Sequence, residues 1–207
     1  MIFIIIRLEN ENDYCEVEKL VINTFWNIYR PGAFEHYIVH NLRKDESFIE
    51  NLAFVVESDE NIIAHINYST GIIDYGDEKA EGVVLGPLSV EKKYQNQGIG
   101  SKLITYSLEK AQKMDIPYVF VIGDENYYQR FGFKSASEYN IYLEGTDTED
   151  ECPFFMIKVF DSLKLKDKRG IFHNPDVFHV DESCVDEFDR NFEYKEKLVL
   201  DGQLEGV

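Results

Sequence analysis

The residues best suited to chemistry lie between positions 85 and 103. An apolar strand pattern ends there, a polar loop follows, and an expected helix opens with Gly98 and Gly100. The first backbone N–H groups of a helix lack partners within the helix and form the positive end of its dipole. Because glycine has no side chain, a phosphate can approach such groups closely. The stretch Gln95–Ser101 is therefore a candidate diphosphate site.

Two common phosphate-binding patterns are excluded. The Gly-x-x-x-x-Gly-Lys-Ser/Thr spacing of a P-loop is absent. The third glycine of a Rossmann fingerprint is also absent, and the preceding strands have the pattern of an antiparallel hairpin. Because a Gly-x-Gly pair also opens ordinary helices, the glycines alone leave a purely structural role open.

Three segments in a fixed order resemble the GNAT superfamily of N-acetyltransferases. Gln95-x-x-Gly98-x-Gly100 is similar to its Gln/Arg-x-x-Gly-x-Gly/Ala signature. Leu88-Ser89-Val90 precedes it at the spacing of the family's bulged fourth strand, and Tyr128–Phe133 resembles the Tyr-x-x-x-Gly-Phe segment after its fifth strand. Together with Gly86-Pro87 and Tyr127, these segments look like one bacterial branch. The resemblance covers about residues 1–160.

The resemblance implies an α/β fold of the mixed α+β kind, with a central, mostly antiparallel sheet and helices on both faces. The hydrophobic periodicity agrees with this fold. It predicts helices over 13–28, 34–42 and 98–114, and strands over 3–8, 52–57, 62–69, 83–90, 118–122, 141–143 and 154–159. We expect a domain of residues 1–160 and a C-terminal extension, 161–207, that packs on the domain through its phenylalanines.

The resemblance implies acetyl-CoA as the co-substrate. Acyl transfer to an amine needs an anchor for the diphosphate and N–H donors for the developing oxyanion. Pro87 cannot donate a ladder hydrogen bond, so we expect a bulge or edge there, with N–H groups free for a ligand. The resemblance implies that these N–H groups belong near Leu88 and Val90. The expected coenzyme-binding residues are Leu88, Ser89, Val90, Gln95, Asn96, Gln97, Gly98, Ile99, Gly100, Ser101 and Asn126.

Tyr128 is the catalytic acid that the resemblance implies. A phenol with a pKa near 10 is suited to protonating a thiolate leaving group of similar pKa. Tyr127 is its neighbour in the sequence and cannot share its face, so we expect one of the two tyrosines to be structural. A packing role for Tyr128 is the alternative.

No base is identified. Glu81 lies three positions before the site that some family members use, and Val84 stands at that site. Acceptor recognition in this family comes from the region of the first helix, where Trp26 and Tyr29 lie beside Pro31-Gly32. We therefore expect Trp26, Tyr29 and Glu81 to contact the acceptor.

Composition limits the partners. The chain has 21 basic and 39 acidic residues and a net charge of −18. Nucleic acids and anionic membranes are unfavourable partners, since both are bound largely through Lys and Arg. The acids gather at residues 144–151 and 176–196 and favour a cationic acceptor, although an acidic surface also serves solubility alone.

The cysteines and the N-terminus indicate a reducing compartment. Cys15, Cys152 and Cys184 are widely spaced, which argues against a zinc knuckle and a disulfide framework. The spacing of His173, Asp176 and His179 fits no standard metal site, so we expect no metal. The apolar run at residues 2–6 is too short for a signal peptide or a membrane span, and we expect a cytoplasmic protein.

These observations predict an N-acetyltransferase in which a primary amine, on a small molecule or a peptide, attacks the thioester of acetyl-CoA directly. A non-catalytic acyl-CoA sensor or interaction module on the same fold is the alternative. The missing base and the acidic extension motivate this alternative. The sequence leaves the choice of amine and a possible homodimer open.

Overall fold

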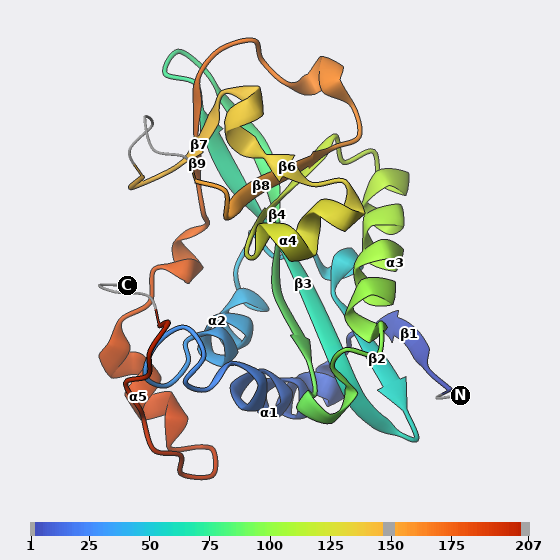
Figure 1. The fold of residues 1–207 in the computed structure, drawn as a ribbon, viewed down its shortest axis with the longest axis vertical. Coiled ribbons are helices and arrows are strands. Elements are labelled where there is room, and N and C mark those ends of the chain that lie inside the picture. The colour runs from blue at the N-terminus through green and yellow to red at the C-terminus, as the bar shows by residue number, and fades with distance from the viewer. Residues whose placement is uncertain (1–2, 147–151, 204–207) are drawn as a thin grey trace.

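The computed structural model describes residues 3–146 and 152–203 (Figure 1). Residues 147–151 of the acidic stretch 144–151 therefore lie outside the described residues. The helices are α1 (Tyr14–Phe25), α2 (Glu35–Leu42), α3 (Ile99–Lys113), α4 (Glu125–Tyr128) and α5 (Glu182–Asp189). The strands are β1 (Ile5–Leu8), β2 (Phe54–Ser58), β3 (Asn61–Asp74), β4 (Lys79–Val90), β5 (Tyr118–Ile122), β6 (Lys134–Ser135), β7 (Ile141–Leu143), β8 (Phe155–Val159) and β9 (Gly170–His173).

The strands form one mixed sheet in the order β1-β2-β3-β4-β5-β8-β6. The neighbours pair antiparallel, except that β4 and β5 run parallel. β9 adds to the sheet by pairing antiparallel with β3 and parallel with β7. The predicted mixed, mostly antiparallel sheet is confirmed.

Helices cover both faces of the sheet, as predicted (Figure 1). On one face, α1 packs Val17 and Val21 against Val55 of β2. On the other face, Leu103 and Ile104 of α3 are fully buried against a larger apolar core. Burial of each such side chain contributes about 1.5–3 kcal/mol, so these two layers hold the sheet between them.

The neighbouring strands β4 and β5 separate towards one end of the sheet. β4 and β5 are in register at Val83–Val119, Val84–Phe120 and Leu85–Val121. Beyond Leu85, three residues of β4 oppose two of β3, because Leu85 pairs with Tyr68 and Leu88 with Ile66. The extra residue is a bulge at Gly86-Pro87, as the sequence predicts. β4 therefore turns away from β5 at this bulge.

The extension contributes to the sheet and to the helical face. Phe172 of β9 is fully buried, and its ring lies where a Cβ on Gly71 or Gly82 would clash. Strand β3 continues to Asp74, five residues beyond the predicted end at residue 69. β9 pairs with Ile72–Asp74, which lie in this additional part. Past β9, the chain reaches α5, which lies beside α2 (Figure 1). The boundary at residue 160 stays a prediction.

Helix α1 ends three residues earlier than expected. Trp26 is its C-cap, and Asn27 adopts a left-handed conformation with φ of 60°. Asn27 N donates to Gly32 O at 2.8 Å, which closes a tight loop. We call residues 26–34, between α1 and α2, the acceptor loop, after the role that the sequence predicts for it.

Candidate functional site

The last residues of β4 direct two N–H groups away from β3. Glu91 N donates to Ile63 O of β3 at 2.8 Å. Because successive residues of a strand alternate in hydrogen-bonding direction, the N–H groups of Leu88 and Val90 point to the opposite edge. β5 no longer pairs there, since its register with β4 ends at Leu85. Two donors thus face the space between the diverging strands.

Ile122 lies at the end of β5, where β4 and β5 diverge. It ends β5, and 44% of its surface is exposed, although the four residues before it are buried. An apolar side chain at the mouth of the diverging strands suits the methylene and methyl groups of an acyl carrier. Sequence reasoning missed this residue, because Ile122 has the same type as the buried positions of a central strand.

The N-terminus of α3 lies beyond the end of β4 and is open. Gly98 is the N-cap, with φ of +79° and ψ of 4°, and no side chain caps the helix. A Cβ built on Gly98 would meet nothing within 4 Å. The side chains of the preceding loop fold back instead: Gln95 Nε2 donates to Val90 O at 3.0 Å and Gln97 Nε2 to Lys93 O at 2.8 Å. The helix therefore offers uncapped N–H groups to an anion.

Gly100 is required by a different contact. A Cβ at this position would lie 2.8 Å from the hydroxyl of Tyr127 and 3.3 Å from Val90 Cγ2. The Tyr127 hydroxyl also hydrogen-bonds Ser101, and Arg130 lies 5.0 Å from the Tyr127 ring centroid. Tyr127 is thus part of the surface around the N-terminus of α3.

Tyr128 points to the other side of α4. Its ring lies over Gly123, where a Cβ would approach it to 2.6 Å, and it packs on Phe133 with centroids 5.7 Å apart. Burial raises the pKa of Tyr128, and the nearby hydroxyls of Tyr127 and Tyr29 raise it further. The phenol therefore keeps its proton well above neutral pH.

Two carboxylates act electrostatically on Tyr29 of the acceptor loop. Tyr29 is 45% exposed. Its pKa is raised by the packing around its ring and then by the charges of Glu35 and Asp124. Burial also raises the pKa of Glu35, whose carboxylate accepts from Phe34 N at 3.0 Å. The side of the site that carries Tyr29 therefore also carries two acidic residues.

Three other predicted residues lie in different surroundings. Trp26 is half-buried, and its indole N–H donates to Glu196 O at 3.0 Å. Asn126 is exposed, and Asp124, not Asn126, caps α4. Glu81 is exposed near the start of β4, opposite Ile72, and the structure does not bring it to the diverging ends of β4 and β5. Of the predicted acceptor residues, Tyr29 is the one whose hydroxyl affects the pKa of Tyr128.

Polar side chains lie beneath α1 and α2, on the same face of β3 and β4. His65, Asn67 and Ser89 are buried. Their side-chain nitrogen and oxygen atoms have no hydrogen-bond partner in the described residues. Burial lowers the pKa of His65 to about 3, and the charge of Arg43 acts in the same direction. His65 is therefore neutral at physiological pH. Ser89, which was predicted to contact the coenzyme, points its hydroxyl into this buried layer.

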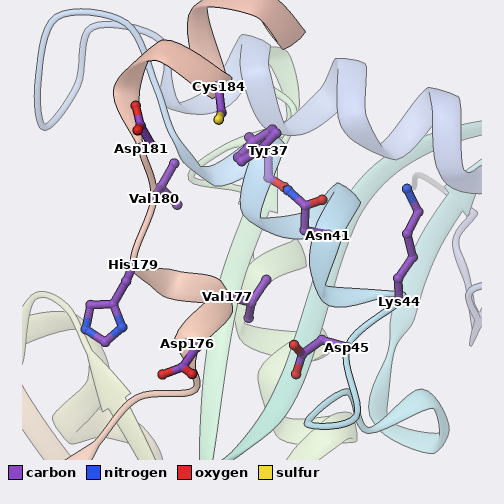
Figure 2. A pocket seen from close by; sticks show the side chains of 10 residues that line it. All are labelled: Tyr37, Asn41, Lys44, Asp45, Asp176, Val177, His179, Val180, Asp181 and Cys184. Carbon is purple, nitrogen blue, oxygen red and sulfur yellow. The ribbon is translucent and has the colours of Figure 1, made fainter.

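A groove of about 440 Å³ lies between α2 and the extension (Figure 2). Tyr37 and Asn41 of α2 form one wall, and Val180 and Cys184 belong to the other. None of the sequence-predicted site residues lines it. The groove is thus separate from the diverging strands.

The described residues contain no group of three or more His, Cys, Asp or Glu side chains that could hold a metal ion. Within the same part of the chain, no helix is long and apolar enough to cross a membrane.

Comparison with protein families identifies one domain. The acetyltransferase (GNAT) domain family matches residues 50–135, a range that includes β4, the N-terminus of α3 and Tyr128. The chain is 29% identical over 146 residues to the uncharacterized N-acetyltransferase YhbS of Escherichia coli K12, covering 70% of this chain and 82% of that protein. It is 30% identical over 100 residues to the uncharacterized N-acetyltransferase YjhQ of the same strain, covering 48% and 55%.

Solved structures agree in fold. The crystal structure of Escherichia coli YhbS in complex with CoA superposes with a TM-score of 0.74 at 24% identity, over 87% of this chain and 94% of that one. A GNAT family acetyltransferase from Brucella melitensis in complex with acetyl-CoA gives a TM-score of 0.68 at 26% identity, over 86% and 99%. Both neighbours thus bind CoA or its acetyl ester.

Proposed function

This chain belongs to the GNAT superfamily and is an acetyltransferase, and we propose that it transfers the acetyl group of acetyl-CoA to a cationic primary amine. The family assignment accounts for the acetyltransferase activity, whereas the acceptor and the roles of individual residues are inferred from the site. The observation that carries the proposal is the pair of Leu88 and Val90 N–H groups directed between β4 and β5, next to the uncapped helix α3.

The open N-terminus of α3 holds the diphosphate. Gly98 leaves space in front of the first N–H groups of the helix, and their positive dipole end favours an anion. Lys92, Lys93 and Lys102 add positive charge to this end of a strongly acidic chain. Tyr127 supplies a hydroxyl at the same place, beside Ser101. Bound here, the coenzyme supplies an acetyl thioester.

The strand edge then holds the pantetheine and the thioester. The N–H groups of Leu88 and Val90 hydrogen-bond carbonyl oxygens in the space that β5 leaves open. An N–H group that faces the thioester carbonyl stabilises the oxyanion that forms when an amine attacks it. Loss of one such donor typically slows a reaction by about 10²–10³-fold.

Tyr128 protonates the departing thiolate. Its raised pKa keeps the phenol protonated through the pH range in which an amine becomes nucleophilic. Its ring is fixed by Gly123 and Phe133, so the hydroxyl has a defined position. A fixed donor adds about 10²–10⁴-fold to a proton-transfer step.

Glu35 and Asp124 attract the acceptor. The charges of both carboxylates raise the pKa of Tyr29, which supports an electrostatic attraction for a cation beside that ring. A protonated amine is drawn to this side and must lose its proton before it attacks. Since Glu81 lies away from the diverging strands, bulk water is the acceptor proposed for that proton.

The test is thiol release from acetyl-CoA with a panel of amines. We expect cationic acceptors, such as polyamines and lysine-containing peptides, to give higher kcat/KM values than neutral or anionic amines. The advantage should shrink in 1 M salt, where the Debye length falls to about 3 Å. An acyl-CoA sensor would instead bind the coenzyme and release no thiol above the amine-free rate. A preference for anionic amines would contradict the role of Glu35 and Asp124.

A further inference from the structure

The end of the chain is bonded to the acceptor loop. We call residues 194–203 the C-terminal segment; it follows α5 and lies against the loop between α1 and α2 (Figure 1). Trp26 Nε1 and Asn27 Nδ2 both donate to Glu196 O, at 3.0 and 2.9 Å. Leu198 N donates to Asn27 Oδ1 at 3.1 Å. The contact therefore joins residues about 170 positions apart in the sequence.

Asn27 is the centre of this contact. Its side-chain oxygen also accepts from Gly32 N at 2.8 Å, and its backbone O accepts from Gln203 Nε2 at 3.2 Å. Its own N–H donates to Gly32 O at 2.8 Å. One residue thus holds both ends of the turn that carries Tyr29 and joins that turn to the C-terminal segment. Its left-handed φ of 60° suits asparagine, which tolerates this conformation better than most residues.

Lys197 fixes the same turn from outside. Its Cε lies 3.0 Å from where a Cβ on Gly32 would stand, so the alkyl chain covers the glycine. Its ammonium pairs with Asp186 and with Asp189 of α5. Asp189 in turn accepts from His36 of α2 at 2.9 Å, taking the histidine as the donor. The C-terminal segment is therefore tied to α5 as well as to the loop.

Aromatic packing anchors α5 itself. The ring of His36 is fully buried and stacks on Phe188 at 5.5 Å, with Phe192 edge-on at 5.3 Å. Tyr37 and His40 of α2 contact Phe188 as well. The anchor is thus an apolar contact, whereas the hydrogen bonds around Asn27 are exposed or half-exposed.

We infer that Asn27 is a positioning residue through which the C-terminal segment sets the conformation of the acceptor loop, and hence the affinity for the amine. The inference rests on the proposed function, because it assigns the loop to amine binding. The diphosphate site at α3 and Tyr128 receive no hydrogen bond from this segment among the described residues. Loss of Asn27 should therefore act on the KM for the amine and leave the coenzyme and the chemical step unaffected.

The experiment compares Asn27→Gly with Asn140→Gly. Asn140 also has a left-handed backbone, with φ of 56°, but lies before β7, so it controls for a new glycine at this conformation. Asn27→Gly should raise the KM for the best cationic amine about tenfold, because a displaced binding loop loses contacts with the substrate. We expect kcat and the calorimetric Kd of CoA to stay within twofold of the wild type. Lys197→Ala should raise the same KM.

A second readout separates this inference from the proposed function. Hydrogen exchange at the Gly32 and Leu198 amides should speed up in Asn27→Gly and stay as in the wild type in Asn140→Gly. A wild-type chain that binds CoA but acetylates no amine would contradict the proposed function alone. Unchanged exchange at both amides, or an unchanged amine KM in an active Asn27→Gly variant, would overturn the inference. A tenfold increase in the Kd of CoA in Asn27→Gly, equal to the expected change in amine KM, would also overturn the inference.

Discussion

The rings of Tyr127 and Tyr128 are nearly perpendicular, with centroids 5.1 Å apart and an interplanar angle of 87°. The two residues are neighbours in the sequence, but their side chains contact different parts of the structure. Tyr127 extends its hydroxyl to Gly100 and Ser101, whereas Tyr128 lies over Gly123 in the core. This divergence supports different roles for the two phenols, one at the coenzyme and one at the reacting atoms.

Tyr128→Phe should lower kcat by roughly 10²-fold, because the thiolate would lose its positioned proton donor. The Kd of CoA should change little, since the Tyr128 ring packs on Gly123 and Phe133. Tyr127→Phe is the matched variant, and we expect it to weaken CoA binding while reducing kcat less. Steady-state kinetics and calorimetry measure both effects. Greater damage to kcat from Tyr127→Phe would mean that the acid has been assigned to the wrong tyrosine.

Gly98→Asp should abolish detectable CoA binding. The new side chain enters the space in front of α3, and its charge repels a diphosphate. Any residue other than glycine is strained at φ of +79°, so the control must share this cost. Gly76→Asp does so: Gly76 has φ of +90°, open space around it, and a place in the turn at the other end of β4. Calorimetry measures the Kd of CoA for both folded variants. Equal Kd values for Gly98→Asp and Gly76→Asp would contradict a diphosphate site at the N-terminus of α3.

The local parts of this picture could be predicted from the sequence. Gly98 and Gly100 lie within one short segment, and the bulge at Gly86-Pro87 follows from the missing N–H of proline. The mixed character of the sheet could also be anticipated, since an antiparallel run of strands is followed by a strand-helix-strand unit. These features are determined by residues that are close together in the sequence.

The contacts that complete the acceptor side depend on residues far apart in the chain. Asn27 and Glu196 are 169 positions apart, and neither has a residue type that distinguishes it from other polar residues of a loop. Phe172 looked like one of several scattered phenylalanines, yet Gly71 and Gly82 leave space for its ring. Glu35 carried no signal either, because helices often begin with an acid. Only the folded chain brings Glu35 and Asp124 to Tyr29.

The pH dependence of turnover should follow the amine. An ordinary primary amine has a pKa near 10.4, so the reactive fraction rises up to tenfold per unit between pH 6 and 9. Because the pKa of Tyr128 is raised above its ordinary value of 10, the acid does not lose its proton in that range. We expect kcat/KM for the amine to increase throughout, as measured in constant-ionic-strength buffers. A decline below pH 9 that disappears in Tyr128→Phe would contradict a raised pKa.

His65 should make the folded chain sensitive to acid. In the unfolded chain a histidine binds a proton near pH 6.5, whereas the pKa of His65 in the fold is about 3. Protonation therefore favours unfolding as the pH falls through this window, by up to about 1.4 kcal/mol per unit. We expect the free energy of unfolding, measured by urea titration, to fall between pH 6.5 and 4.5 by about 2 kcal/mol less in His65→Gln than in the wild type.

His179→Gln is the control variant for a histidine-to-glutamine change, because the His179 side chain is 62% exposed. A His65→Gln variant with the wild-type slope would show that another group dominates the acid sensitivity. His36, whose pKa is also lowered by burial, would then be the next residue to replace.

The most direct test of acetyl transfer from CoA to an amine by this chain follows both products of one reaction. Purified protein, acetyl-CoA and a cationic diamine are incubated, and released thiol is compared with acetylated amine identified by mass. We predict equal amounts of both, in proportion to protein and absent with Gly98→Asp. Thiol release without acetylated amine, or identical rates with and without protein, would contradict the account.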